Sequence, residues 1–119
     1  MPSVRKEDLK VAVSDLPSGV RLLQLNGPLT LSTLLEFQEA VRQDKTKSLL
    51  LDVSGVPYMD SAGLGTVISV FVSCQSSHRG FGMFGICDRI QQLLDLTRVS
   101  SLMPCFSSLE EADSKLNAG

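Results

Sequence analysis

Hydrophobic positions along the chain follow two periods, and each period predicts one type of secondary structure. Alternating apolar residues predict a half-buried strand over residues 9–16. The turn residues 17–19 (Pro-Ser-Gly) follow, and a second strand over 20–25 completes a predicted hairpin. The nearly continuous apolar run over 48–53 is typical of a central strand that is covered on both faces. Shorter strands are predicted over 82–86 and 102–106.

Between the later strands, apolar residues recur every three or four positions, which predicts helices. In the first helix, Ser32 suits the N-cap position and the pattern stops near Asp44. The second helix begins at Asp60 or Ser61 and is apolar on most sides, which predicts deep packing. Asp88 could cap a third helix, and a fourth is predicted over 108–116. The apolar stripe expected to bury the first helix consists of Leu34, Leu35, Phe37, Ala40 and Val41.

The predicted order of elements is β-β-α-β-α-β-α-β-α, which indicates an α/β fold. Because strands and helices alternate after the hairpin, the connections should be right-handed crossovers within a mostly parallel sheet. The length of 119 residues fits one domain. We expect its core to span residues 9–116, with loosely held termini at 1–8 and 117–119. An edge strand of the hairpin could pair with a second copy, but nothing in the sequence requires it, so the oligomeric state stays open.

Composition narrows the classes of function. The net charge is −2 and the Lys and Arg residues are scattered, so the sequence predicts no nucleic-acid partner. No segment approaches the ~20 apolar residues of a membrane span, which predicts no membrane partner and a cytoplasmic location. The three cysteines, Cys74, Cys87 and Cys105, match no metal or redox spacing. They are interpreted as small apolar core residues in a reducing compartment.

The segment 52–65 joins a buried strand to a buried helix and has a small, polar tip. Ser61 lies where the helix begins, so free backbone N–H groups and the positive end of the helix dipole favour an added anion there. Gly63 and Gly65 each weaken the first turn by roughly 1 kcal/mol relative to Ala, which makes sense if something approaches the backbone closely. A simpler interpretation also fits: Asp60 or Ser61 is an ordinary N-cap, and the glycines permit tight packing of helix on strand.

Other chemistries fit the sequence less well. The run 80–85 (Gly-Phe-Gly-Met-Phe-Gly) has the letters of a dinucleotide-binding motif, but it should form a strand instead of opening a helix. His78, the only histidine, follows the second helix and should lie roughly 20 Å or more from Ser61, which disfavours a serine hydrolase. Asp52 and Asp60 could form a carboxylate pair, but no third ligand accompanies them, so we predict no catalytic residue, metal or cofactor.

The run from Leu50 to Gly65, Leu-Leu-Asp-Val-Ser-Gly-Val-Pro-Tyr-Met-Asp-Ser-Ala-Gly-Leu-Gly, closely resembles the signature of STAS domains. More narrowly, it is similar to that of bacterial anti-sigma-factor antagonists. The resemblance extends from about Leu9 to Leu116, and it includes the turn 26–29 (Asn-Gly-Pro-Leu) and the helix 90–96. It implies a sheet of four or five strands with four helices packed mainly on one face.

In the family that the chain resembles, an anti-sigma factor with serine-kinase activity phosphorylates the serine after the aspartate, which is Ser61 here. The resemblance implies that the unphosphorylated chain binds the anti-sigma factor and frees the sigma factor. Phosphorylation ends that binding, and a phosphoserine phosphatase restores it. ATP and Mg²⁺ belong to the kinase, so this chain is expected to be a non-enzymatic regulator of transcription. The residues expected to contact the partner are Thr30, Thr33, Met59, Asp60, Ser61, Ala62, Gly63, Leu64 and Gly65.

Two positions depart from the family pattern. Thr30 stands where many antagonists have an aspartate beside the phosphorylation site, so hydrogen bonding is kept but the charge is lost. Ala62 replaces a frequent second serine and leaves Ser61 as the only hydroxyl in the turn. The missing carboxylate motivates a second hypothesis: a STAS scaffold that is never phosphorylated and serves a sensory or transport complex, or binds a small ligand. A third hypothesis, a small hydrolase, has little support in the sequence.

Overall fold

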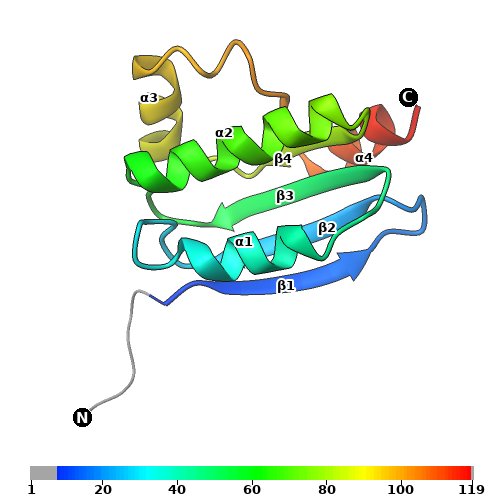
Figure 1. The fold of residues 1–119 in the computed structure, drawn as a ribbon. Helices are drawn as coiled ribbons and strands as arrows, with labels where there is room; N and C mark the ends of the chain where they lie inside the picture. The colour runs from blue at the N-terminus through cyan, green and yellow to red at the C-terminus, as the bar shows by residue number, and fades with distance from the viewer. Residues whose placement is uncertain (1–7, 119) are drawn as a thin grey trace.

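The computed structural model describes residues 8–118, which contain five strands and four helices in the predicted order (Figure 1). The strands are β1 (Lys10–Asp15), β2 (Arg21–Asn26), β3 (Ser48–Gly55), β4 (Gly80–Phe84) and β5 (Cys105–Phe106). The helices are α1 (Leu34–Arg42), α2 (Ser61–Ser76), α3 (Asp88–Leu96) and α4 (Leu109–Ala118). None of these four helices is long and apolar enough to cross a membrane.

The termini were predicted to be loosely held. Most of those residues, 1–7 and 119, lie outside the described part of the chain. Asp8 is exposed and belongs to no strand or helix. At the other end, α4 continues through Ala118, two residues beyond the predicted end of the last helix.

The five strands form one sheet in the order β1-β2-β3-β4-β5. β1 pairs antiparallel with β2, as predicted for the hairpin, and the remaining pairs are parallel. Leu22, Leu50 and Gly82 lie in one row across the three central strands. Parallel neighbours cannot be joined by a tight turn, so each later strand is reached through a helix on a face of the sheet. The predicted α/β class and mixed, mostly parallel sheet are confirmed.

Helices cover both faces of the sheet, but unequally. α1, α2 and α3 pack on one face, where Phe37 and Val67 join a large apolar core. α4 covers the other face, where Ala112 packs in a smaller cluster with Leu50. Figure 1 shows α1 and α2 in front of the sheet and α4 behind it. Successive residues of a strand point to opposite faces, so Leu50 enters the α4 cluster while Leu51 enters the large core. The helices therefore lie mainly on one face, as predicted.

The first helix begins two residues after its expected cap. The N-cap position is occupied by Thr33, not Ser32, and the Thr33 side chain caps nothing. Its buried hydroxyl instead donates to the carbonyl of Pro28 (2.8 Å) and accepts the N–H of Thr30 (2.9 Å). This hydroxyl therefore provides hydrogen-bond partners for backbone groups of the loop before α1.

The predicted apolar stripe of α1 is wrong at one position. Leu35 is 63% exposed, although it was expected to face the core. Neighbouring residues on a helix point about 100° apart, so Leu34 and Leu35 cannot both share the direction of Phe37. Leu34 packs against the core and Leu35 faces outward.

Several boundaries differ from the predictions by one to three residues, and the starts of α3, β4 and β5 are examples. Asp88 is the first residue of α3, and Cys87 occupies the N-cap position. β4 begins at Gly80, two residues earlier than expected, and β5 is only Cys105–Phe106. The glycine-rich run 80–85 thus begins in a strand, as predicted, and does not open a helix.

At the amino ends of the parallel strands, a buried carboxylate joins three segments. The Asp44 side chain, 0% exposed, follows α1 and forms ion pairs with Arg79 and with Nη1 of Arg21 (3.8 Å). Its Oδ1 also accepts the amide (3.1 Å) and the hydroxyl (2.7 Å) of Thr46. Nε of Arg79 donates to the carbonyl of Thr46 (2.6 Å). This network orders the connection between α1 and β3.

Candidate functional site

Ser61 is the first residue of α2, and its side chain lies exposed at the carboxyl end of the sheet. Within residues 8–118, no hydrogen bond involves its hydroxyl group. The helix cap is Asp60, whose Oδ1 accepts the N–H of Gly63 at 2.8 Å. Of the two capping residues that the sequence left open, Asp60 is therefore the cap, and the Ser61 hydroxyl is free for chemistry.

Asp60 also joins the start of α2 to the loop between β2 and α1. Its Oδ2 accepts the N–H of Leu31 at 3.0 Å. The backbones meet as well, because the amide of Asp60 donates to the carbonyl of Leu29 (3.3 Å) and the amide of Leu29 donates to the carbonyl of Tyr58 (3.2 Å). The N–H groups of Leu31 and Gly63 hold the pKa of Asp60 below its ordinary value. Asp60 is thus an ionised clamp between two segments that are far apart in sequence.

The two glycines of the turn have different roles. A Cβ on Gly63 would lie 2.0 Å from the carbonyl oxygen of Leu29, so only glycine permits this approach of the two backbones. The close contact expected from the sequence is therefore made by the chain itself. A Cβ on Gly65 would meet nothing within 4 Å, and Gly65 is exposed. Nothing within the domain requires glycine at position 65.

The predicted partner-binding residues divide into surface and interior positions. Ser61 and Gly65 are exposed, and Thr30, Asp60 and Ala62 are half-buried. The remaining four residues are buried and therefore support the surface more than they form it: Thr33, Met59, Gly63 and Leu64. The Thr30 hydroxyl lies 3.2 Å from that of Ser32, in the loop held beside Ser61 by Asp60.

Two exposed leucines at this edge escaped the sequence analysis. Leu31 is 72% exposed although its amide is bound by Asp60, and Leu35 is 63% exposed on the first turn of α1. In the sequence, both leucines are close to apolar residues that do enter the core, so their exposure was not predicted. The exposure of one leucine in α1 could have been predicted, because the neighbours Leu34 and Leu35 cannot share one helix face. Asp60 therefore holds the backbone of Leu31, which carries an exposed apolar side chain, against the start of α2.

The serine hydrolase, the carboxylate pair and the metal site find no support in the geometry of residues 8–118. His78 is exposed in the turn after α2, so the helix separates it from Ser61 by about 24 Å. Asp52 accepts the amide (2.9 Å) and hydroxyl (2.6 Å) of Ser54 and does not pair with Asp60. Among residues 8–118, no three His, Cys, Asp or Glu side chains are placed to hold a metal ion.

The cysteines were expected to be core residues, which is confirmed for Cys74 and in part for Cys87, which packs against the large core, but is wrong for Cys105. Cys74 is buried in α2, and burial raises the pKa of its thiol. Cys87 is half-buried and Cys105 is exposed. Cys105 lies on the two-residue edge strand β5, where one face has no covering helix, which explains why the prediction was wrong there.

A family model described as the STAS domain matches residues 12–112. The chain belongs to the STAS domain family. The anti-sigma-B factor antagonist of Staphylococcus aureus (strain NCTC 8325 / PS 47) is 30% identical to this STAS domain over 84 residues, which cover 68% of this chain and 78% of the relative. The anti-sigma-B factor antagonist of Staphylococcus epidermidis is 29% identical over 84 residues, with the same coverage. Within the STAS family, the chain groups with the anti-sigma-factor antagonists, a class of regulatory binding proteins and not of enzymes.

Solved structures share the fold of this STAS domain. An anti-sigma factor antagonist from Mycobacterium paratuberculosis superimposes with a TM-score of 0.76 at 20% identity, covering 91% of this chain and 93% of the other. The Bacillus cell fate determinant SpoIIAA in its phosphorylated form superimposes with a TM-score of 0.64 at 14% identity, covering 89% and 98%. At these identities the likeness concerns the fold alone.

Proposed function

We propose that this STAS domain is an anti-sigma-factor antagonist whose binding to a serine-kinase anti-sigma factor is switched off by phosphorylation of Ser61. The observation that carries the proposal is the exposed Ser61 hydroxyl, which makes no hydrogen bond to the described residues while Asp60 caps the helix. A kinase could therefore take Ser61 as substrate without breaking a contact that holds the domain together.

Phosphorylation would form a bond between Oγ of Ser61 and the γ-phosphorus of ATP, with ADP leaving and the hydroxyl proton passing to a base of the kinase. The product carries about −1.5 to −2 charges at neutral pH. The first amides of α2, Ser61 and Ala62, have no intrahelical partner and lie at the positive end of the helix dipole. They favour the phosphate, whereas the ionised Asp60 beside it adds to the negative charge. The domain would stay folded while its surface becomes strongly anionic.

The partner surface in this proposal is an apolar edge around Ser61. Leu31 and Leu35 are its apolar side chains, and Gly65 leaves room for a partner's backbone. Burial of one leucine side chain stabilises a complex by about 1.5–3 kcal/mol, or roughly tenfold to a hundredfold in affinity. A phosphate beside these side chains would have to lose its water on binding, which opposes the complex.

The first test is phosphorylation of the full chain by its cognate anti-sigma factor with ATP and Mg²⁺, located by mass spectrometry. We expect one phosphate, on Ser61, and none on a Ser61→Ala variant. Phosphate on another residue, or none with a partner that binds the chain, would contradict the role of Ser61. The second outcome would instead favour a STAS scaffold that is never phosphorylated.

The second test separates charge at Ser61 from charge elsewhere on α2. Isothermal titration of the anti-sigma factor should show strong binding to the wild-type chain and to Ser61→Ala, and a loss of at least about tenfold for Ser61→Asp. Ser69→Asp adds the same charge at an exposed position about 12 Å further along α2 and should bind like wild type. Equal losses for both aspartates would refute a local switch.

The proposal includes reversal by a phosphoserine phosphatase and action in the cytoplasm, where the kinase finds ATP. Incubation of the phosphorylated chain with such a phosphatase should restore binding of the anti-sigma factor. A phosphorylated chain that still binds the anti-sigma factor fully would show that the modification is not the switch.

A further inference from the structure

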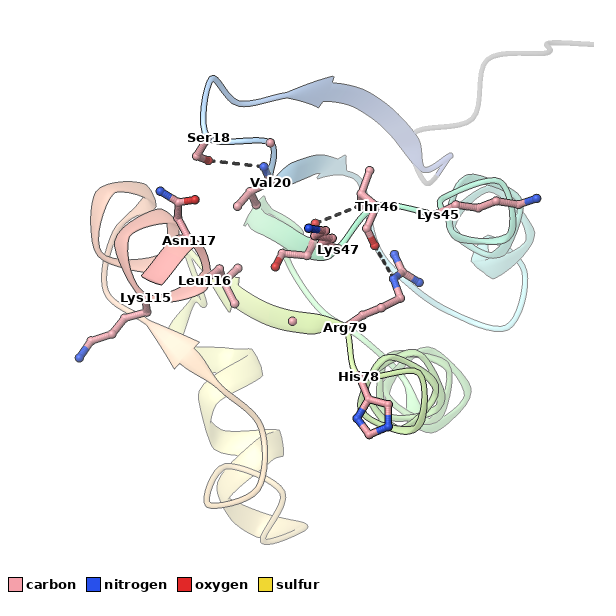
Figure 2. A pocket seen from close by; sticks show the side chains of 13 residues that line it. Ser18, Val20, Lys45, Thr46, Lys47, His78, Arg79, Lys115, Leu116 and Asn117 are labelled. Carbon is pink, nitrogen blue, oxygen red and sulfur yellow. Dashed lines mark hydrogen bonds between the residues drawn. The ribbon is translucent and has the colours of Figure 1, made fainter. Parts of the chain in front are cut away.

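At the end of the sheet opposite Ser61, the surface has a hollow of about 940 Å³ that is rich in positive charge. It lies at the amino ends of β3 and β4, between the β1–β2 turn and the end of α4, as Figure 2 shows. Lys45, Lys47, Arg79 and Lys115 line it, with His78 at its edge. Among the described residues that line it, none is Asp or Glu. We refer to this region as the basic hollow.

Ion pairs neutralise only one of the four cationic side chains named above in the basic hollow. Arg79 is paired with the buried Asp44, so these two charges cancel. Lys45, Lys47 and Lys115 form no ion pair with any residue in 8–118. Lys115 acts only at longer range: the pKa of Glu111 is lowered chiefly by the amide and hydroxyl of Ser107 and in smaller part by the charge of Lys115. Three positive charges therefore gather in a chain whose net charge is −2.

The negative carboxyl ends of nearby helices offset part of this positive charge. α1, α2 and α4 all end near the basic hollow, and each carboxyl end carries about half a negative charge. Lys45 follows α1 and Lys115 lies in the last turn of α4, so both offset such an end. Lys47 belongs to no helix and precedes β3. The three helix ends together balance about half of the lysine charge, and the Asp113 carboxylate, which accepts the Ser18 hydroxyl at 2.5 Å, offsets about one charge more. An excess of about half a positive charge remains.

The floor of the basic hollow is rigid, while its rim can adapt. The hydrogen bonds of Arg79 and Thr46 to Asp44 hold the floor, and the amide of Gly80 donates to the carbonyl of Lys47 at 2.8 Å. Figure 2 shows Lys45 and Lys115 at opposite rims, with their ammonium groups directed outward and Lys47 and Arg79 between them. Lysine stems are flexible, so both rim lysines can turn inward towards an anion.

We propose that the basic hollow is a binding site for a small molecule that carries a multivalent phosphate group, such as a pyrophosphate. Lysines act as point charges for phosphate, and three of them around one floor favour a group with more than one negative charge. The side-chain amide of Asn117 supplies a further polar group in the lining, whereas the hydroxyls of Ser18 and Thr46 already donate to the carboxylates of Asp113 and Asp44. The hollow has the volume of a small-molecule site, and its apolar contacts come from Val20 and Leu116.

This site would be separate from Ser61. β3 runs from the basic hollow towards the phosphoacceptor, and its eight residues span about 26 Å. A ligand in the basic hollow therefore leaves the proposed partner surface uncovered. The proposal does not depend on phosphorylation of Ser61.

The test is a titration of the full ¹⁵N-labelled chain with sodium pyrophosphate at neutral pH, followed by amide NMR shifts at constant ionic strength. Saturable shifts are expected at Gly19, Lys47, Gly80 and Asn117, which line the basic hollow. Sodium chloride of the same ionic strength should not reproduce them. Shifts spread over the whole surface, or centred on Ser61 and Ala62 at the start of α2, would overturn the proposal.

Variants with matched charge changes decide the location. Lys47→Glu should weaken pyrophosphate binding by about tenfold, because one attraction becomes a repulsion. Lys10→Glu makes the same change on exposed β1 and should leave the affinity within about twofold of wild type. If Lys47→Glu disturbs the fold, as amide shift dispersion would reveal, Lys47→Gln should still weaken binding by about threefold. Equal effects at positions 47 and 10 would show unspecific attraction and refute the site.

Discussion

At the scale of single residues, the neighbours Asp60 and Ser61 have different roles: Asp60 holds the backbone in place, and Ser61 presents a free hydroxyl. Asp60 accepts the amides of Gly63 and Leu31 and so holds the start of α2 against the β2–α1 loop. Ser61 makes no such contact and presents its hydroxyl to solvent. A residue that is not needed for the fold can be modified without unfolding the protein, and its neighbour keeps it in place.

The clamp made by Asp60 should depend on pH. Hydrogen bonds lower its pKa in the folded state, so its stabilisation is complete above the unfolded pKa of about 3.9 and is lost as the pH falls through the folded pKa. We expect Asp60→Ala to reduce the free energy of unfolding by about 1 kcal/mol at neutral pH. Urea unfolding at a series of pH values should show this difference shrinking below about pH 4. A difference that stays constant to low pH would mean that the charge of Asp60 is unimportant.

The two glycines of the turn offer a matched pair of substitutions. Gly63→Ala places a methyl group against the carbonyl of Leu29 and should destabilise the domain by about 2 kcal/mol or more. Gly65→Ala meets open space on the same helical turn and should stabilise it by about 0.5–1 kcal/mol. Chemical denaturation of both variants measures the contrast. Similar effects at the two positions would contradict the contact with Leu29.

At the scale of elements, α2 sets the geometry of both ends of the molecule. Its start carries Ser61, and its end leads through His78 to Arg79, which pairs with Asp44. The Asp44 network joins the first residue of β2 to the segments that precede β3 and β4, and these three strands are the centre of the sheet. Burial of the carboxylate is tolerated because two arginines and Thr46 surround it.

Loss of the Asp44 carboxylate should therefore destabilise the folded domain. Asp44→Ala leaves Arg79 without its partner in a partly buried site and should reduce the free energy of unfolding by about 3 kcal/mol. Asp15→Ala removes an exposed carboxylate that also pairs with Arg21, and it should cost less than about 1 kcal/mol. Urea unfolding of the two variants at one pH provides the comparison. If Asp44→Ala were as mild as Asp15→Ala, the network would not be a determinant of stability.

At the scale of the whole molecule, the sheet separates two surfaces of opposite character. The carboxyl edge has Ser61, the ionised Asp60 and exposed leucines, and the amino edge has the basic hollow. Helices on both faces bury the strands between them, so neither edge is needed to complete the core. Changes of charge at one edge should therefore alter binding without changing the fold.

This separation predicts that a mimic of phosphorylation leaves the fold intact. Ser61→Asp adds a negative charge at the positive end of α2 and breaks no hydrogen bond, so the free energy of unfolding should change by less than about 1 kcal/mol. Thermal unfolding and amide NMR spectra of Ser61→Asp and wild type check this directly. A large loss of stability, or shifts throughout the sheet, would show that Ser61 has a structural role.

Much of the architecture was determined by the sequence alone. The order of elements, the hairpin and the buried β3 follow from the spacing of apolar residues, because strands and helices bury their side chains with different periods. The start of α2 was also predictable, because Asp60 and Ser61 suit the end of a helix where N–H groups lack partners. These features depend on residues that are close together in the chain.

The tertiary structure decided what depends on residues that are distant in the chain. Only the packing of the β2–α1 loop on α2 shows that Gly63 is needed against Leu29, that Thr33 is buried, and that Leu31 is exposed. The basic hollow likewise brings together Lys47 and Lys115, which are 68 positions apart in the sequence. The local spacing of apolar residues indicates which side chains prefer the core. The pairing of strands and the placement of helices on the sheet determine which backbone segments come into contact and which charged side chains lie close together.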